Sequence, residues 1–219
     1  MSAGSGTSTV SAVTTGNSGV ASWLVLALRA VVALIVGFAV TFTSGHSAVF
    51  GLVVFGVFAI GEGAIITAGA FGNRPERRSR GLFVLQGAVT VVAGIAALAL
   101  PEGGVHYLVW VVSAWAVVTG ALELVNGIRA RGRIAAARDW MFLGGLALIL
   151  AIAFLVVPPD YTQTLGGIEQ VHGQLTASVV LDGIFGAWAI VLGVLLGIAA
   201  VSARGARPST TSTEGKALS

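Results

Sequence analysis

The chain has 219 residues, of which 56% are hydrophobic and only 10% are charged. Because a soluble domain usually carries about a quarter charged residues, this chain has too few of them to cover a water-facing surface. It contains no Cys, which excludes disulfides, thiolate metal sites and a Cys nucleophile. The composition therefore predicts an integral membrane protein whose partner is the lipid bilayer. The formal net charge of +3 does not indicate a nucleic-acid partner, because the basic residues lie in short blocks between apolar runs.

The N-terminal segment, residues 1–21, is rich in Ser, Thr and Gly and contains no charged residue. A secretory signal would begin with basic residues and would have a shorter apolar core. We therefore interpret this segment as a disordered cytoplasmic tail. Residues 204–219 are similarly polar, and they are predicted to form a second disordered tail.

Six apolar runs lie between the two tails. Crossing the hydrocarbon core of a bilayer takes roughly 20 apolar residues in a helix. Transmembrane β-strands would alternate polar and apolar residues, and these runs do not. The predicted fold class is therefore an all-α integral membrane protein with six transmembrane helices. The runs are Ser22–Thr43, Ala48–Phe71, Gly81–Leu100, Tyr107–Ile128, Trp140–Val157 and Leu175–Ala203.

The basic residues indicate how the helices are oriented. All but one of the 12 Lys and Arg residues lie in segments 72–80 and 129–139 or after position 203. The loops 44–47, 101–106 and 158–174 contain none. Short loops rich in Lys and Arg stay in the cytoplasm. The pattern therefore predicts that both termini are cytoplasmic.

The runs also repeat along the chain. Leu28–Gly37 aligns with Leu85–Gly94, and Ser113–Gly120 aligns with Gly186–Gly193 through a matched Trp-to-Gly spacing. Leu143–Ile152 is the third copy of the first segment. Two spans return the chain to the side where it started, so the repeated two-helix hairpins share one orientation, unlike the inverted repeats of many transporters. We predict one transmembrane domain, residues 22–203, made of hairpins 22–71, 81–128 and 140–203.

These features resemble the HdeD family, bacterial six-span membrane proteins built from a short repeat of unknown function. The likeness rests on Arg29 in the first span, on Pro101 and Pro158 after the odd spans, and on an Ala-Trp-Ala segment in the even spans. It covers roughly residues 23–204, and Ser44 stands where the first hairpin would carry its Pro. The resemblance implies a six-span protein of the bacterial inner membrane. It also implies a part in acid resistance, to which the family's named member is tied.

Polar residues inside the apolar runs are the first candidate site. Arg29, Gln86 and Glu123 lie about 10 Å from the cytoplasmic edge of their runs at 1.5 Å per residue, and Glu62 lies about 15 Å deep. A lone charge at such a depth is costly, so we expect Arg29 to pair with Glu62 or with Glu123. The pair would either lock the helices together or belong to a proton or ion relay. Since two acids share one base, one carboxyl would be protonated or would face water, and Glu62 is the candidate for a relay.

Three His residues form a second candidate site. His46, His106 and His172 fall one in each predicted outer loop, together with acidic residues and no fixed positive charge. Imidazoles gain charge as the pH falls through about 6.5. The outer face could therefore sense pH, or these could be ordinary loop His residues. A metal site is the least favoured alternative: the three His could converge if the hairpins form a ring, but no partner ligands stand at close spacing.

Gly residues in the last run form the third candidate. Gly186, Gly193 and Gly197 fall on one predicted helix face, and small residues at such spacing allow helices to approach closely. The face would pack inside the bundle, or against a second copy or a membrane protein partner.

Motifs of enzymes are missing from the sequence. It contains no Gly-rich phosphate loop, no zinc-protease helix and no nucleophile elbow. We therefore expect no catalytic residue, no cofactor and no metal. Three functions stay open: a non-enzymatic contribution to acid or envelope stress resistance, a small transporter or channel for protons or a small solute, and a scaffold for a partner protein.

Overall fold

The computed structural model describes residues 15–72, 77–132, 136–165 and 173–205. This part of the chain contains six helices, and each is long and apolar enough to cross a membrane. The predicted fold class is confirmed. The helices are α1 Thr15–Phe42, α2 Ala48–Gly72, α3 Arg77–Ala99, α4 Gly104–Ala130, α5 Ala137–Val156 and α6 Ala177–Gly205.

The terminal helices extend slightly beyond the predicted domain. The helix α1 begins at Thr15, inside the segment predicted as a tail, although its apolar span is Trp23–Phe42. No Pro lies before that span to prevent the helix from starting earlier. The helix α6 ends at Gly205. The rest of both predicted tails lies outside the described residues.

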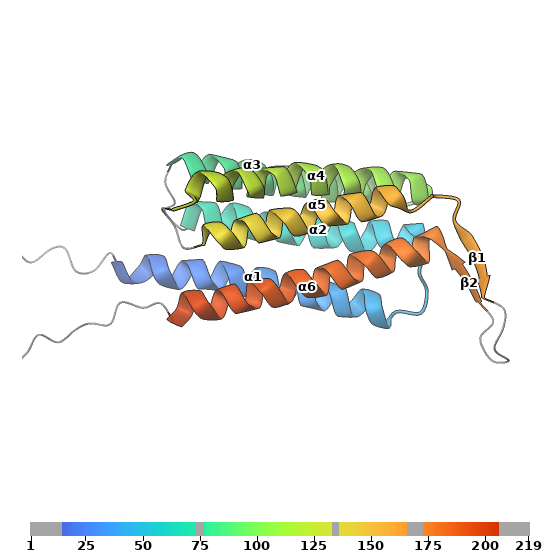
Figure 1. The fold of residues 1–219 in the computed structure, drawn as a ribbon, viewed down its shortest axis with the longest axis horizontal. Helices are drawn as coiled ribbons and strands as arrows, with labels where there is room; N and C mark the ends of the chain where they lie inside the picture. The colour runs from blue at the N-terminus through green and yellow to red at the C-terminus, as the bar shows by residue number, and fades with distance from the viewer. Residues whose placement is uncertain (1–14, 73–76, 133–135, 166–172, 206–219) are drawn as a thin grey trace, which may run out of the picture.

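A small β-hairpin, which the sequence analysis did not predict, lies between α5 and α6. Its strands are β1 Thr162–Leu165 and β2 Gly173–Thr176, and they pair antiparallel, with Thr162 opposite Thr176. The strands are beyond the ends of the helices (Figure 1). We call this end of the bundle the hairpin end. The opposite end, where α1 begins and α6 finishes, is called the basic end because Arg80, Arg129 and Arg204 lie there.

The six helices form three close pairs, α1 with α6, α2 with α3, and α4 with α5. In each pair, Gly or Ala residues seven positions apart bring the backbones together. A Cβ atom built on Gly63 would lie 2.6 Å from the carbonyl oxygen of Gly87, which no larger residue allows. The facing residues are Ala30 and Gly37 with Gly193 and Gly186, Gly56 and Gly63 with Gly94 and Gly87, and Gly120 and Gly127 with Gly144 and Ala137.

Each close pair joins two different predicted hairpins, and the last hairpin returns to the first. The two helices within a hairpin contact one another more loosely. Between α3 and α4 an apolar groove of about 420 Å³ remains, with Ala93 and Val111 among its lining residues. The hairpins are therefore the units of the sequence repeat, whereas the tight packing lies between them.

The helices α2, α4 and α6 form the inner part of the bundle. Between 44% and 50% of the residues in their apolar spans are buried, compared with 28% to 33% in α1, α3 and α5. Five aromatic side chains from these inner helices meet in the middle of the bundle, with contacting ring centroids between 5.1 and 6.2 Å apart. We call them the aromatic cluster: Phe55, Phe58, Trp115, Phe185 and Trp188.

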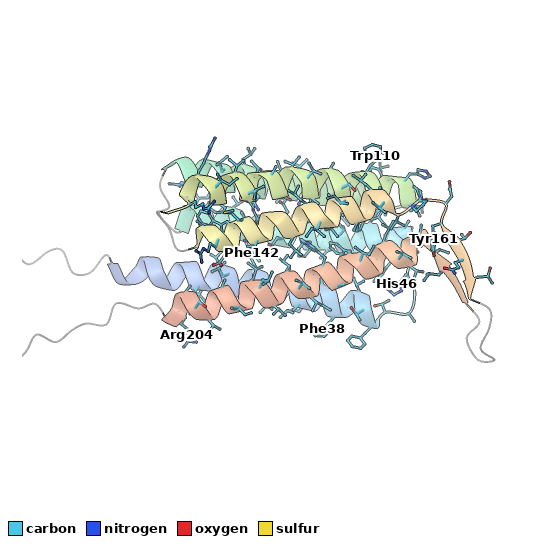
Figure 2. The ribbon with its side chains drawn as sticks, viewed as in Figure 1. Phe38, His46, Trp110, Phe142, Tyr161 and Arg204 are labelled. Atoms are coloured by element: carbon cyan, nitrogen blue, oxygen red, sulfur yellow. The ribbon has the colours of Figure 1, made fainter. Side chains whose placement is uncertain are left out.

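Large apolar side chains cover the outside of the bundle. Phe38, Trp110 and Phe142 project away from the helices in Figure 2, and between 50% and 71% of each is exposed. Such a surface suits lipid, because a helix satisfies its own backbone hydrogen bonds and can present apolar side chains to hydrocarbon.

The glycines of α6 provide a test of the close pairs. A Cβ on Gly193 would lie 2.6 Å from Leu34 Cγ and 3.0 Å from the Ala30 carbonyl oxygen, whereas a Cβ on Gly197 would have no atom within 4 Å among the described residues. We therefore expect Gly193→Ala to lower the free energy of unfolding by about 1–3 kcal/mol, as overpacking does. Gly197→Ala, in the same helix, should not lower it, because Ala meets no atom there and favours a helix over Gly. Thermal unfolding of the purified protein in detergent would compare them, and equal shifts for the two variants would contradict this packing.

Candidate functional site

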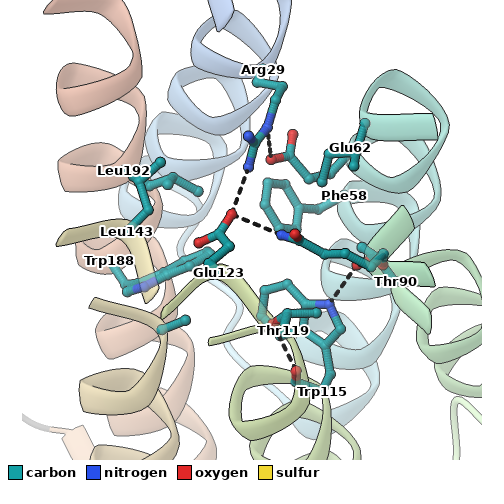
Figure 3. Close-up of a pocket in the computed structure, with 13 residues that line it drawn as sticks. Arg29, Phe58, Glu62, Thr90, Trp115, Thr119, Glu123, Leu143, Trp188 and Leu192 are labelled. Carbon is teal, nitrogen blue, oxygen red and sulfur yellow. Dashed lines mark hydrogen bonds and ion pairs between the residues drawn. The ribbon is translucent and has the colours of Figure 1, made fainter. Parts of the chain in front are cut away.

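The four intramembrane polar residues predicted from the sequence meet in one place. The Arg29 Nε donates a hydrogen bond of 2.6 Å to Glu62 Oε1, and its Nη2 lies 3.5 Å from Glu123 Oε1. The Gln86 Nε2 donates a 2.8 Å hydrogen bond to the same oxygen of Glu123. Each of the helices α1 to α4 supplies one of these side chains (Figure 3). We call them the Arg–Glu cluster.

The inner faces of α2 and α4 determine where the carboxyls lie. Glu62 follows Phe58 by one helical turn on α2, and Glu123 follows Thr119 by one turn on α4, so both point toward the bundle interior. Gln86 reaches Glu123 because α3 packs closely on α2 at Gly87 and Gly63. The Arg29 side chain extends inward from the outer helix α1. Among the described residues, it is the only cationic side chain that forms an ion pair with Glu62 or Glu123.

The cluster is largely withdrawn from the surface. The side chains of Arg29, Glu62 and Glu123 are 11%, 3% and 9% exposed, respectively. The sequence left two choices for the second acid, which were protonation and contact with water. Because burial removes most of the contact with water, charge balance favours a neutral cluster in which the two carboxyls hold one proton between them.

Two fully buried acceptor atoms of the cluster receive no hydrogen bond from the described part of the protein. They are Glu62 Oε2 and Gln86 Oε1. Both residues line a cavity of about 20 Å³, which also borders Arg29 and Glu123. The cluster therefore keeps unused hydrogen-bonding capacity beside a small internal space.

Three further residues beside the cavity were missed in the sequence. The Thr90 hydroxyl donates to the Gln86 carbonyl oxygen and accepts a hydrogen bond from Trp115 Nε1, and the Thr119 hydroxyl donates to the Trp115 carbonyl oxygen. The spacing of four between Gln86 and Thr90, and again from Trp115 to Thr119 to Glu123, is the signal that would have placed them on one helix face.

On the side toward the hairpin end, the aromatic cluster closes the site. Along α2 the inner face runs from Gly51 through Phe55 and Phe58 to Glu62, one turn at a time. Asp182 of α6 lies beyond these rings, buried beside Gly51 at the start of α2. From its place near the outer end of the last apolar run, Asp182 was expected to mark the membrane interface, with a role in a pore as the alternative. The aromatic rings therefore separate Asp182 from the Arg–Glu cluster.

The predicted His site is not brought together in the described residues. His46 is half-buried, and its Nε2 lies 3.1 Å from the Val40 carbonyl oxygen. His106 is exposed in the first turn of α4 and not in a loop as expected, because that helix begins at Gly104. His172 lies outside the described residues. Within residues 15–72, 77–132, 136–165 and 173–205, no three His, Asp or Glu side chains are close enough to hold a metal ion.

The predicted Gly site is only partly one packing face. Gly186 contacts Val40 and Thr41 of α1, and Gly193 contacts Leu34, as described above. Gly197, by contrast, faces open space within the described bundle. The structure contains one chain, so a contact with a second copy stays a prediction.

Comparison with known proteins identifies the repeat. The family described as "Short repeat of unknown function (DUF308)" matches residues 28–93 and again residues 85–156, which together span more than half of the chain. The first match contains Arg29, Glu62 and Gln86, and the second contains Gln86 and Glu123. No curated protein and no solved structure matches the chain.

Removing the cation of the cluster tests its charge balance. In Arg29→Met two carboxyls remain buried without a counter-ion, and breaking a buried pair in this way costs about 3–5 kcal/mol. The two acids can become neutral only by binding protons, so we expect the free energy of unfolding of this variant to rise as the pH falls, unlike that of a conventional core variant. Unfolding in detergent over a range of pH measures this.

The matched control removes all three charges, in Arg29→Met with Glu62→Gln and Glu123→Gln. This variant should recover most of the lost stability at neutral pH. If the triple variant were no more stable than Arg29→Met, the pairing of these charges would not be what holds the cluster.

Proposed function

Since the chain belongs to the DUF308 family of short repeats of unknown function, we propose that it is a non-enzymatic bacterial inner-membrane protein that contributes to acid or envelope stress resistance. In this proposal the Arg–Glu cluster is its acid-responsive part. The cluster holds one proton at neutral pH, and the response to acid is the binding of a second proton, so that Glu62 and Glu123 are both neutral. The observation that carries the proposal is the burial of two carboxyls with a single guanidinium in the interior of a membrane bundle.

Two further points support this reading. HdeD-like proteins, which the chain resembles, are built from this short repeat, and the named member of that family is tied to acid resistance. Ionisable groups inside membrane bundles are rare and usually functional, because a structure that needed only stability could replace them with apolar residues at no loss.

The location also forms part of the proposal. The basic residues at the basic end favour a cytoplasmic position for both termini through the positive-inside rule. The cluster would then respond to acidification of the cytoplasm, because the aromatic cluster lies between it and the hairpin end.

A small proton transporter is the second candidate, and the internal position of the cluster favours it. A transporter must open its site to both sides in turn. The packed aromatic rings would have to separate for the hairpin end to be reached. Proton flux across the membrane of liposomes that contain the purified protein distinguishes the two candidates. A measurable flux would favour the transporter, and no flux would favour the acid-responsive protein.

Survival at low pH tests the proposed function. A strain lacking the gene is complemented with the wild type, with Glu62→Gln or with Glu102→Gln. Glu62 lies in the cluster, whereas Glu102 is exposed near the hairpin end. Glu102→Gln is therefore the matched control, because it makes the same chemical change outside the cluster. We expect wild type and Glu102→Gln to restore survival and Glu62→Gln to fail, at equal protein abundance in the membrane. Full rescue by Glu62→Gln would overturn the role of the cluster.

A further inference from the structure

The unpaired acceptors of the Arg–Glu cluster indicate a bound ligand. Glu62 Oε2 and Gln86 Oε1 are buried and receive no hydrogen bond from the described residues, and both residues line the same cavity. Buried polar atoms are nearly always paired in native proteins. A small molecule bound in the cavity would supply donors to both atoms.

The guanidinium of Arg29 is hydrogen-bonded to Glu62 Oε1 through Nε and lies near Glu123 through Nη2, and the other side-chain donors around the cavity are already engaged. The hydroxyl protons of Thr90 and Thr119 are donated to the carbonyl oxygens of Gln86 and Trp115. The Trp115 Nε1 donates to Thr90 Oγ1, and the Gln86 Nε2 donates to Glu123. Apart from Arg29, none of these groups can turn toward the two free acceptors without leaving another acceptor unpaired.

We propose that the cavity is a binding site for one water molecule that links Glu62 Oε2 to Gln86 Oε1. Its volume of about 20 Å³ holds one water and nothing larger, and a water molecule needs two or more polar partners to stay in a buried site. Two acceptors on residues that line one cavity suit water because it carries two hydrogens.

The water also explains how the cluster can change its protonation state without leaving an unpaired group. With Glu62 ionised, the water donates one hydrogen to Glu62 Oε2 and the other to Gln86 Oε1. With Glu62 protonated, its O–H donates to the water oxygen, and the water still donates to Gln86 Oε1. This second part rests on the proposed function, whereas the water site itself does not.

The other groups that face the site are consistent with this role. Arg29 from α1 and Glu123 from α4 are the remaining charged side chains beside the cavity. The helices α5 and α6 contribute only Leu143, Ala147, Trp188 and Leu192 to its lining, none of which titrates.

Infrared spectroscopy of the full chain in lipid nanodiscs tests the water site. Spectra in ordinary water and in ¹⁸O-labelled water are compared for the wild type and for Gln86→Met, which removes the acceptor at similar length. We expect an O–H stretching band that shifts with ¹⁸O in the wild type and is lost in Gln86→Met. If Gln86→Met does not fold, Leu192→Phe fills the same cavity while all four polar groups remain, and it should lose the band as well.

The outcomes separate the water site from the proposed function. The water site would be overturned if the wild type showed no ¹⁸O-sensitive band, or if its band remained in these variants. This holds whatever the survival assay shows. A band that is present in the wild type, together with full acid survival of Glu62→Gln, would keep the water site and overturn the proposed function.

Discussion

Two carboxyls and one guanidinium share a buried site in a bundle whose outer surface is apolar, and this charge imbalance is the constraint on which the account depends. A net charge in such a place is costly, so the cluster needs a proton to be neutral. The pairing of Arg29 with both Glu62 and Glu123 also requires α1, α2 and α4 to converge at one level. Structure and chemistry are therefore linked, because the helices cannot separate there without exposing an unpaired charge to lipid.

The surrounding architecture supplies the convergence. Close pairs at Gly and Ala bring each outer helix against an inner one, so Gln86 of α3 reaches Glu123 of α4. The inner helices then meet through Phe58, Trp115 and Trp188. The aromatic cluster fixes the bundle on the side toward the hairpin end and leaves the polar groups on the other side. A site of this kind is suited to binding a proton from one direction.

The sequence was sufficient to predict the number of helices and the four cluster residues, because long apolar runs and charges inside them are both rare in other contexts. It could not decide whether Arg29 pairs with Glu62 or with Glu123, since a long Arg side chain reaches either, and the structure shows contacts with both. That choice depends on how neighbouring hairpins pack, which no local pattern encodes.

Other features were missed for similar reasons. Thr90 and Thr119 are common residues of membrane helices, and only their spacing from Gln86 and Glu123 marks them. Gly193 and Gly197 are nearly equivalent along α6, yet only Gly193 touches α1. The two glycines differ because α1 and α6 approach one another at Gly193 and not at Gly197. That difference is a property of the tertiary structure. The β-hairpin was missed because strands of four residues give too short a pattern to recognise.

The most direct test of the account asks whether the cluster holds a proton at neutral pH. The infrared spectrum of a protonated carboxyl differs from that of a carboxylate, and subtracting the spectrum of Glu62→Gln or of Glu123→Gln from that of the wild type isolates the cluster. Either substitution leaves one carboxylate for one guanidinium, so neither variant needs the shared proton. We therefore expect a carboxylic-acid band that is present in the wild type and absent from both variants, and that appears in both difference spectra. Differences that contain only carboxylate bands would show that both acids are ionised, and would contradict the central claim.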